Sequence, residues 1–146
     1  MKKLLLFAFL TISIIACKDS STQNKVEITF KDLDLMKSKP INEIEEYLQK
    51  CNYNSLNNQF SNQWKSGESE DVVQFNDKGV LVFLTYNHQT FEKLIIDLKK
   101  STYIYSGKKM KNSLEVETYT KNQELIFLST MINPEDGKKV YSLTFI

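Results

Sequence analysis

The chain has 146 residues, a formal net charge of +1, two cysteines and a single histidine. Its basic residues are all lysines, so it lacks the planar guanidinium group that binds phosphates and carboxylates through paired hydrogen bonds. The balanced charge argues against a nucleic-acid partner, which needs a basic face, and we expect none. One histidine and four scattered glycines also disfavour a zinc centre, a P-loop and a dinucleotide site, and we expect no cofactor.

The first 16 residues have the pattern of a secretory signal peptide. Lys2 and Lys3 precede an apolar run that reaches Ala16, and this run is shorter than the roughly 20 residues that span a bilayer. We therefore expect residues 1–16 to be removed. The mature chain would then carry 17 lysines and 18 acidic residues, a net charge of −1.

The sequence Ile14-Ile15-Ala16-Cys17 resembles the lipobox of bacterial lipoproteins, in which a branched apolar residue and a small residue precede a cysteine. The resemblance implies cleavage before Cys17, a thioether from its sulfur to diacylglyceryl, and acylation of the new amine. Two or more acyl chains, at about 0.8 kcal/mol per buried methylene, anchor a protein stably on a membrane. The alternative is that Cys17 is an ordinary small residue at a cleavage site.

Residues 18–25 are polar and without periodicity, which predicts a flexible tether between the lipid and a single domain over residues 26–146. In enterobacterial lipoproteins an aspartate directly after the lipidated cysteine favours the inner membrane, whereas this chain has Lys18 there. The resemblance thus implies an outer-membrane location and leaves open which side the domain faces. With Cys17 lipidated, Cys51 has no partner for an intramolecular disulfide, and we expect it to be a buried, unreactive thiol.

The domain is predicted to be α+β, with an antiparallel sheet packed against two amphipathic helices. Residues 26–30 alternate with the period of a strand, and residues 31–39 could form a helical turn. An amphipathic helix is expected over residues 40–50. Its apolar stripe consists of Ile41, Ile44, Leu48 and Cys51. The spacing of Asn42 and Glu45 is that of a capping box, which would start this helix two residues later.

Residues 52–71 are rich in Asn, Ser and Gln, and could form an irregular loop or include a weak strand near Tyr53. Phe60 and Trp64 are large aromatic side chains in this polar segment. Aromatic residues are common at the centres of protein interfaces, so both are candidates for contact with a partner. The alternative is that they fold back into the core.

Two β-prone segments, residues 72–75 and 80–86, flank a turn-forming tetrapeptide and predict a hairpin. The second segment is apolar on both faces, which is typical of a central strand covered on both sides. A second helix is expected from a Thr90 cap to about Lys100. Its buried face would hold Phe91, Leu94, Ile95 and Leu98. Further strands are predicted at residues 103–105, 114–119, 124–132 and 140–145.

The same order of elements occurs twice: a helix, a tyrosine shortly after it, and strands. Two sets of residues have the same internal spacing, namely Ile44, Leu48 and Tyr53, and Leu94, Leu98 and Tyr103. We therefore hypothesise a pseudo-duplicated domain. In element order, this arrangement resembles beta-lactamase inhibitor proteins and small outer-membrane assembly lipoproteins.

No pattern of residues indicates catalysis or metal binding. His88 has no motif of a catalytic nucleophile beside it. The acidic segments at residues 32–34 and 68–71 lack the spacing of an EF-hand calcium site, and we interpret them as solvated patches. We expect a non-catalytic, membrane-anchored envelope lipoprotein that binds an envelope or secreted protein, with an inhibitor or immunity role as the more specific variant. The alternatives are a carboxylate-based hydrolase of envelope glycan and a carrier of a small hydrophobic ligand.

Overall fold

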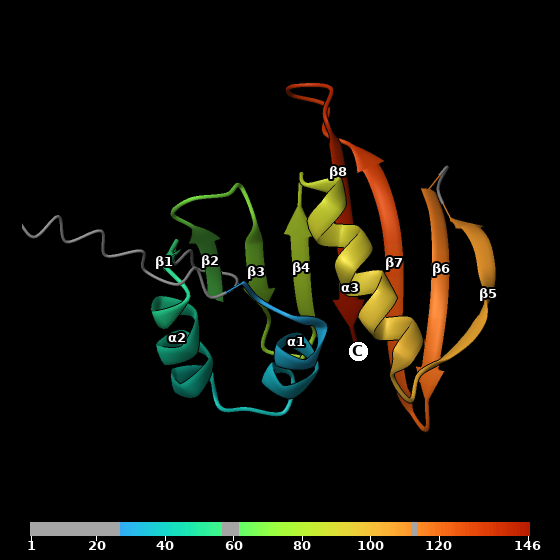
Figure 1. Cartoon of the computed structure of the whole chain (residues 1–146), viewed down its shortest axis with the longest axis horizontal. Coiled ribbons are helices and arrows are strands. Elements are labelled where there is room, and N and C mark those ends of the chain that lie inside the picture. Colours follow the sequence, from blue (N-terminus) through green and yellow to red (C-terminus); the bar gives the residue numbers. More distant parts are fainter. Residues whose placement is uncertain (1–26, 57–61, 112–113) are drawn as a thin grey trace, which may run out of the picture.

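The computed structural model describes residues 27–56, 62–111 and 114–146. Within these ranges the chain forms one eight-stranded antiparallel sheet and three helices (Figure 1). The predicted α+β class is confirmed, with one helix more than expected. The predicted signal peptide, the lipidation site Cys17, the tether and Phe60 lie outside the described residues.

Each half of the chain contributes four antiparallel strands that directly follow a helix, and the first half has one further helix before it. The helices are α1 (Phe30–Met36), α2 (Ile41–Lys50) and α3 (His88–Lys100). The strands are β1 (Tyr53–Ser55), β2 (Asn62–Ser66), β3 (Val72–Phe75), β4 (Leu81–Thr85), β5 (Ile104–Lys111), β6 (Leu114–Lys121), β7 (Glu124–Ile132) and β8 (Lys139–Phe145). Their order in space is β1-β2-β3-β4-β8-β7-β6-β5, so the two four-stranded meanders meet where β4 pairs with β8.

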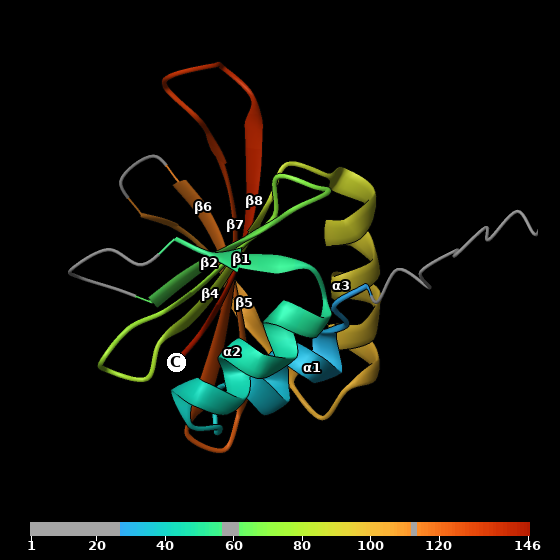
Figure 2. The same cartoon turned by 90° about the vertical axis from the view of Figure 1, so that its left-hand side faces the viewer.

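The described helices all lie on one side of the sheet (Figure 2). On this side the strand register aligns buried residues of neighbouring strands. One such row holds Trp64, Val73, Phe83, Leu143 and Leu128, each at most 4% exposed. The row packs in one core with apolar side chains of α1, α2 and α3. Burial of each of these side chains is worth roughly 1.5–3 kcal/mol.

A capping box decides where α1 begins. The Asp32 amide donates to Thr29 Oγ1 at 3.3 Å, and the Thr29 amide donates to Asp32 Oδ2 at 2.9 Å. These two hydrogen bonds start a helix at Phe30, so the strand predicted for residues 26–30 is wrong in its described part. The helical turn expected within residues 31–39 is confirmed, because α1 occupies the first part of that segment.

The starts of the other two helices are set by Pro40 and by Asn87. α2 begins directly after Pro40, which has no side-chain capping bond, so the capping box predicted from Asn42 does not set its start. α3 is capped by Asn87 rather than Thr90, because Asn87 Oδ1 accepts hydrogen bonds from the amides of Gln89 and Thr90. The helix therefore already includes His88.

The strands confirm the predicted hairpin and meander and extend them. β1 confirms the weak strand near Tyr53. β2 was not predicted, because four of its five residues are polar and only Trp64 is buried. β5 does not end at Tyr105 but continues to Lys111, since an irregularity at Gly107, whose φ is +132°, lets the edge strand stay paired with β6.

A polar cluster around the buried Tyr103 side chain fastens α1 to the hairpin of β6 and β7. The Tyr103 hydroxyl lies 2.8 Å from Asp34 Oδ1 and 2.7 Å from Glu124 Oε2. Lys37 Nζ lies 2.9 and 2.8 Å from the same two oxygens. Hydrogen bonds from Lys37, and then from Tyr103, hold the pKa of Glu124 below its usual range.

We expect Glu124→Gln to destabilise the domain at neutral pH and to have less effect in acid. The pKa of Glu124 is lower in the folded than in the unfolded chain. Its stabilising contribution is therefore present above the unfolded pKa, about 4.3, and is lost as the pH falls through the folded pKa. Urea unfolding of both proteins at pH 7 and pH 3 measures the difference. Glu135→Gln, on the exposed turn before β8, is the control, and an equal loss at both pH values would contradict this account.

Candidate functional site

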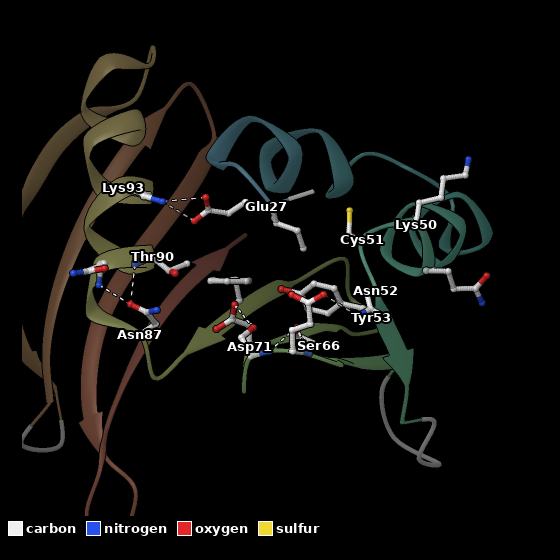
Figure 3. Close-up of a pocket in the computed structure, with 16 residues that line it drawn as sticks. Glu27, Lys50, Cys51, Asn52, Tyr53, Ser66, Asp71, Asn87, Thr90 and Lys93 are labelled. Atoms are coloured by element: carbon white, nitrogen blue, oxygen red, sulfur yellow. Dashed lines mark hydrogen bonds and ion pairs between the residues drawn. The ribbon is translucent and has the colours of Figure 1, made fainter. Parts of the chain in front are cut away.

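A cavity lies between the end of α2 and the start of α3 (Figure 3). Its volume is about 660 Å³, within the range of small-molecule sites. β1, β4 and the turn from β2 to β3 form its floor, and α2, α3 and Glu27 form its walls. The lining is mainly polar, whereas the predicted carrier of a hydrophobic ligand would need an apolar cavity.

A buried carboxylate, Asp71, sits on the floor of this cavity. It is 8% exposed. Thr85 Oγ1 donates to its Oδ1 at 2.5 Å, and Ser69 Oγ donates to its Oδ2 at 2.7 Å. The Thr85 hydroxyl also accepts a hydrogen bond from the Asn87 amide at 3.0 Å. These bonds join the β2–β3 turn to the capping residue of α3 and fix the direction of the carboxylate.

The turn that carries Asp71 fits closely against the end of α2. Ser66 Oγ accepts hydrogen bonds from the amides of Glu68 and Ser69 at 3.2 and 3.1 Å. The Gly67 amide donates to the Asn52 carbonyl at 2.8 Å. A Cβ at position 67 would lie 3.2 Å from Asn52 Nδ2, so the backbones approach each other there as only glycine allows without a shift. The cavity wall is therefore fixed by the backbone.

The Tyr53 side chain lines the cavity beside Asp71 and is 6% exposed. Its hydroxyl has no hydrogen-bond partner among the described residues. Burial, and then the charge of Asp71, raises the pKa of Tyr53, so the phenol stays protonated. The hydroxyl is thus a neutral group able both to donate and to accept a hydrogen bond.

The lining of the cavity also includes an ion pair and a buried thiol. Lys93 Nζ lies 3.0 Å from both carboxylate oxygens of Glu27. Cys51 is 8% exposed, and burial raises the pKa of its thiol. Since the thiolate is the reactive form, the structure agrees with the expected buried, unreactive thiol.

The sequence-predicted site residues do not come together in this cavity. Trp64 is 1% exposed and packs in the core, so its indole is not at the surface for contact with a partner. Among the described residues its Nε1 is buried without a hydrogen-bond partner. His88 lies in the first turn of α3, with its Nε2 3.7 Å from Glu92 Oε1, and does not line the cavity. Cys17 and Phe60 lie outside the described residues.

Sequence reasoning missed the residues on the cavity floor. The interpretation of residues 68–71 as a solvated patch is wrong for Asp71, which is buried. The signal available was weak: a threonine at the end of an apolar strand and an acidic residue before another strand. The predicted hairpin brings the ends of β3 and β4 together, but the sequence pattern did not fix the register that places Asp71 beside Thr85 or indicate that both side chains are buried.

The face of the sheet opposite the helices carries a band of uncharged side chains. One row across it holds Lys65, Val72, Leu84, Ser142, Ser129, Val116 and Lys109. The next row holds Gln63, Gln74, Val82, Thr144, Phe127 and Thr118. Most of these side chains are partly exposed, and no described helix lies over them (Figure 2). We call this surface the open face. The expectation that the strand at residues 80–86 is covered on both sides is therefore wrong for the described structure.

Two further properties concern metals and membranes. Across residues 27–56, 62–111 and 114–146, no three Cys, His, Asp or Glu side chains are grouped as metal ligands would be. None of the helices within the same ranges combines the length and the apolar character needed to cross a bilayer.

No protein-family model, no curated protein and no solved structure matches this chain.

We expect Asp71→Asn to lower the free energy of unfolding by about 1–3 kcal/mol, because an amide nitrogen replaces one of two buried acceptor oxygens. Urea unfolding monitored by circular dichroism measures the change. Asp77→Asn, on the exposed turn between β3 and β4, is the matched control and should have little effect. A stability of Asp71→Asn equal to that of the wild type would show that the hydrogen bonds from Ser69 and Thr85 do not hold the turn.

Proposed function

We propose that this chain is a lipid-anchored lipoprotein of the bacterial outer membrane that binds an envelope or secreted protein through the open face of its sheet. Two features support this proposal: the lipobox that ends at Cys17, and the uncharged band on the side of the sheet that no described helix covers. In this view the domain binds its partner and catalyses no reaction. Its two halves, each a helix followed by four strands, are proposed to be a pseudo-duplication.

The open face is the observation that carries the proposal. The first row has no charged side chain on the five strands between Lys65 and Lys109, and the second row has none on the six strands from Gln63 to Thr118. The apolar members of the band, Val72, Val82, Leu84, Val116 and Phe127, are all partly exposed. Serine, threonine and glutamine side chains separate these apolar residues, and a surface depleted of charge in this way is typical of the centre of a protein interface.

The charges at the two ends of the band select the kind of partner. Lys65 on β2 and Lys109 on β5 are both exposed. A protein with an uncharged centre and acidic residues at its rim would complement this surface. A second copy stacked in the aligned orientation would instead place lysines opposite lysines, which disfavours self-association.

We expect the lipid anchor to depend on Cys17. Bacteria that express the chain should incorporate radioactive palmitate into it, and Cys17→Ala should abolish the label while the precursor accumulates. The label should be lost because the acyl chains would be attached to the sulfur and the amine of Cys17. Lys18→Ala, which keeps the cysteine, is the control and should be labelled normally. Failure of the wild type to take up palmitate would overturn the lipoprotein assignment.

We expect the open face to cross-link to a single protein partner. A photoreactive amino acid at Ser129 should yield one adduct in cells of the native host, and Leu84→Lys in the same protein should remove it, because a buried ammonium in an uncharged interface lacks a partner. The same photoreactive group at Asp97, which is exposed on α3, is the control. Equal adducts from both faces, or adducts to a second copy of this chain alone, would contradict the proposal.

A further inference from the structure

We propose that the cavity between α2 and α3 is a second binding site, and that it takes a neutral, polyhydroxylated ligand such as a sugar unit of a glycan. The cavity lies on the helix side of the sheet, whereas the open face lies on the other. The inference therefore goes beyond the proposed partner-binding function and does not depend on it.

The floor of the cavity supplies a fixed hydrogen-bond acceptor. Two hydroxyl donors, from Thr85 and Ser69, hold the Asp71 carboxylate at 2.5 and 2.7 Å. A carboxylate accepts about four hydrogen bonds, so two hydroxyls leave capacity for a ligand. Because the orientation is fixed before binding, a ligand hydroxyl that donates to Asp71 does not have to order it.

Tyr53 supplies the second, independent observation. Its side chain is more than nine-tenths buried and lines the cavity, and its hydroxyl makes no hydrogen bond to the described residues and is not among their fully enclosed polar atoms, so solvent reaches it. A hydroxyl that faces a cavity and that no protein group occupies is free to bind a ligand. A ligand hydroxyl both donates and accepts, and adjacent hydroxyls of a sugar can serve Asp71 and Tyr53 together.

The charges around the cavity favour a neutral ligand. Its lining holds three carboxylates, on Glu27, Glu68 and Asp71, and two ammonium groups, on Lys50 and Lys93. Glu27 and Lys93 already pair with each other at 3.0 Å. The buried Asp71 carboxylate on the floor would repel a phosphate or carboxylate placed beside it.

The polar walls also disfavour a simple cation. Gln49, Gln89 and Thr90, whose side chains carry both donors and acceptors, are among the residues that line the cavity. An ammonium group offers only donors and would leave the wall donors without partners. A polyhydroxylated ligand can both donate hydrogen bonds to the wall and accept them from it. The aromatic side chains of Tyr53 and Phe83 supply apolar contact beside it.

The test is isothermal titration of the mature, lipidated chain in a detergent without a sugar headgroup. The neutral probes are N-acetylglucosamine, its β-1,4-linked trimer and maltotriose; glucose 6-phosphate is the anionic probe and lysine amide the cationic one. We expect at least one neutral probe to bind and the charged probes to bind more weakly. Tighter binding of a charged probe, or no binding of any neutral probe at millimolar concentration, would overturn the proposal.

Tyr53→Phe separates a binding role from a structural one. The variant keeps the ring and removes only the hydroxyl, so the urea midpoint should stay unchanged or rise, while affinity for the neutral probe should fall about tenfold or more. Tyr105→Phe, on the edge strand β5, is the matched control and should bind normally. Leu84→Lys on the open face should also leave the affinity unchanged. Unaltered affinity of Tyr53→Phe would refute the site.

Discussion

The pairing of β4 with β8 is the contact on which the rest of the structure depends. It runs from Leu81 opposite Phe145 to Thr85 opposite Tyr141 and makes one sheet of two four-stranded meanders. Without it, each half would have a single layer of strands and a short helix, with too little buried apolar surface for independent stability. With it, residues from both halves share one core, whose central pair is Phe83 and Leu143.

A sheet built this way buries only the face that the helices cover. Alternate residues of β4 and β8 point to opposite sides, so each strand gives one set of side chains to the core and another to the open face. The same alternation separates the two sites of the molecule. The proposed partner surface is uncharged because its positions are Val82, Leu84 and their neighbours, whereas the cavity is polar because strand ends and helix starts meet there.

In the proposed cavity site, Asp71 has a structural role as well as a proposed role in binding. Asp71 ties the turn after β2 to the capping segment of α3, so it is needed for the shape of the floor as well as for its charge. Tyr53 differs, because its hydroxyl holds nothing together within the described residues. That hydroxyl is therefore free to bind a ligand without the loss of a structural hydrogen bond.

The sequence by itself determined the elements whose patterns are local: the apolar stripe of α2, the hairpin of β3 and β4, and the buried Cys51. The proposed lipid anchor also rests on sequence alone, because a signal peptide would be recognised as a linear segment. Only the tertiary structure decided the place of Trp64 and the burial of Asp71 against Thr85 at the open end of the predicted hairpin. The physical reason is that burial and hydrogen bonding at these positions depend on the register between paired strands. A polar strand such as β2 has no apolar pattern of its own and is defined by its pairing with β3.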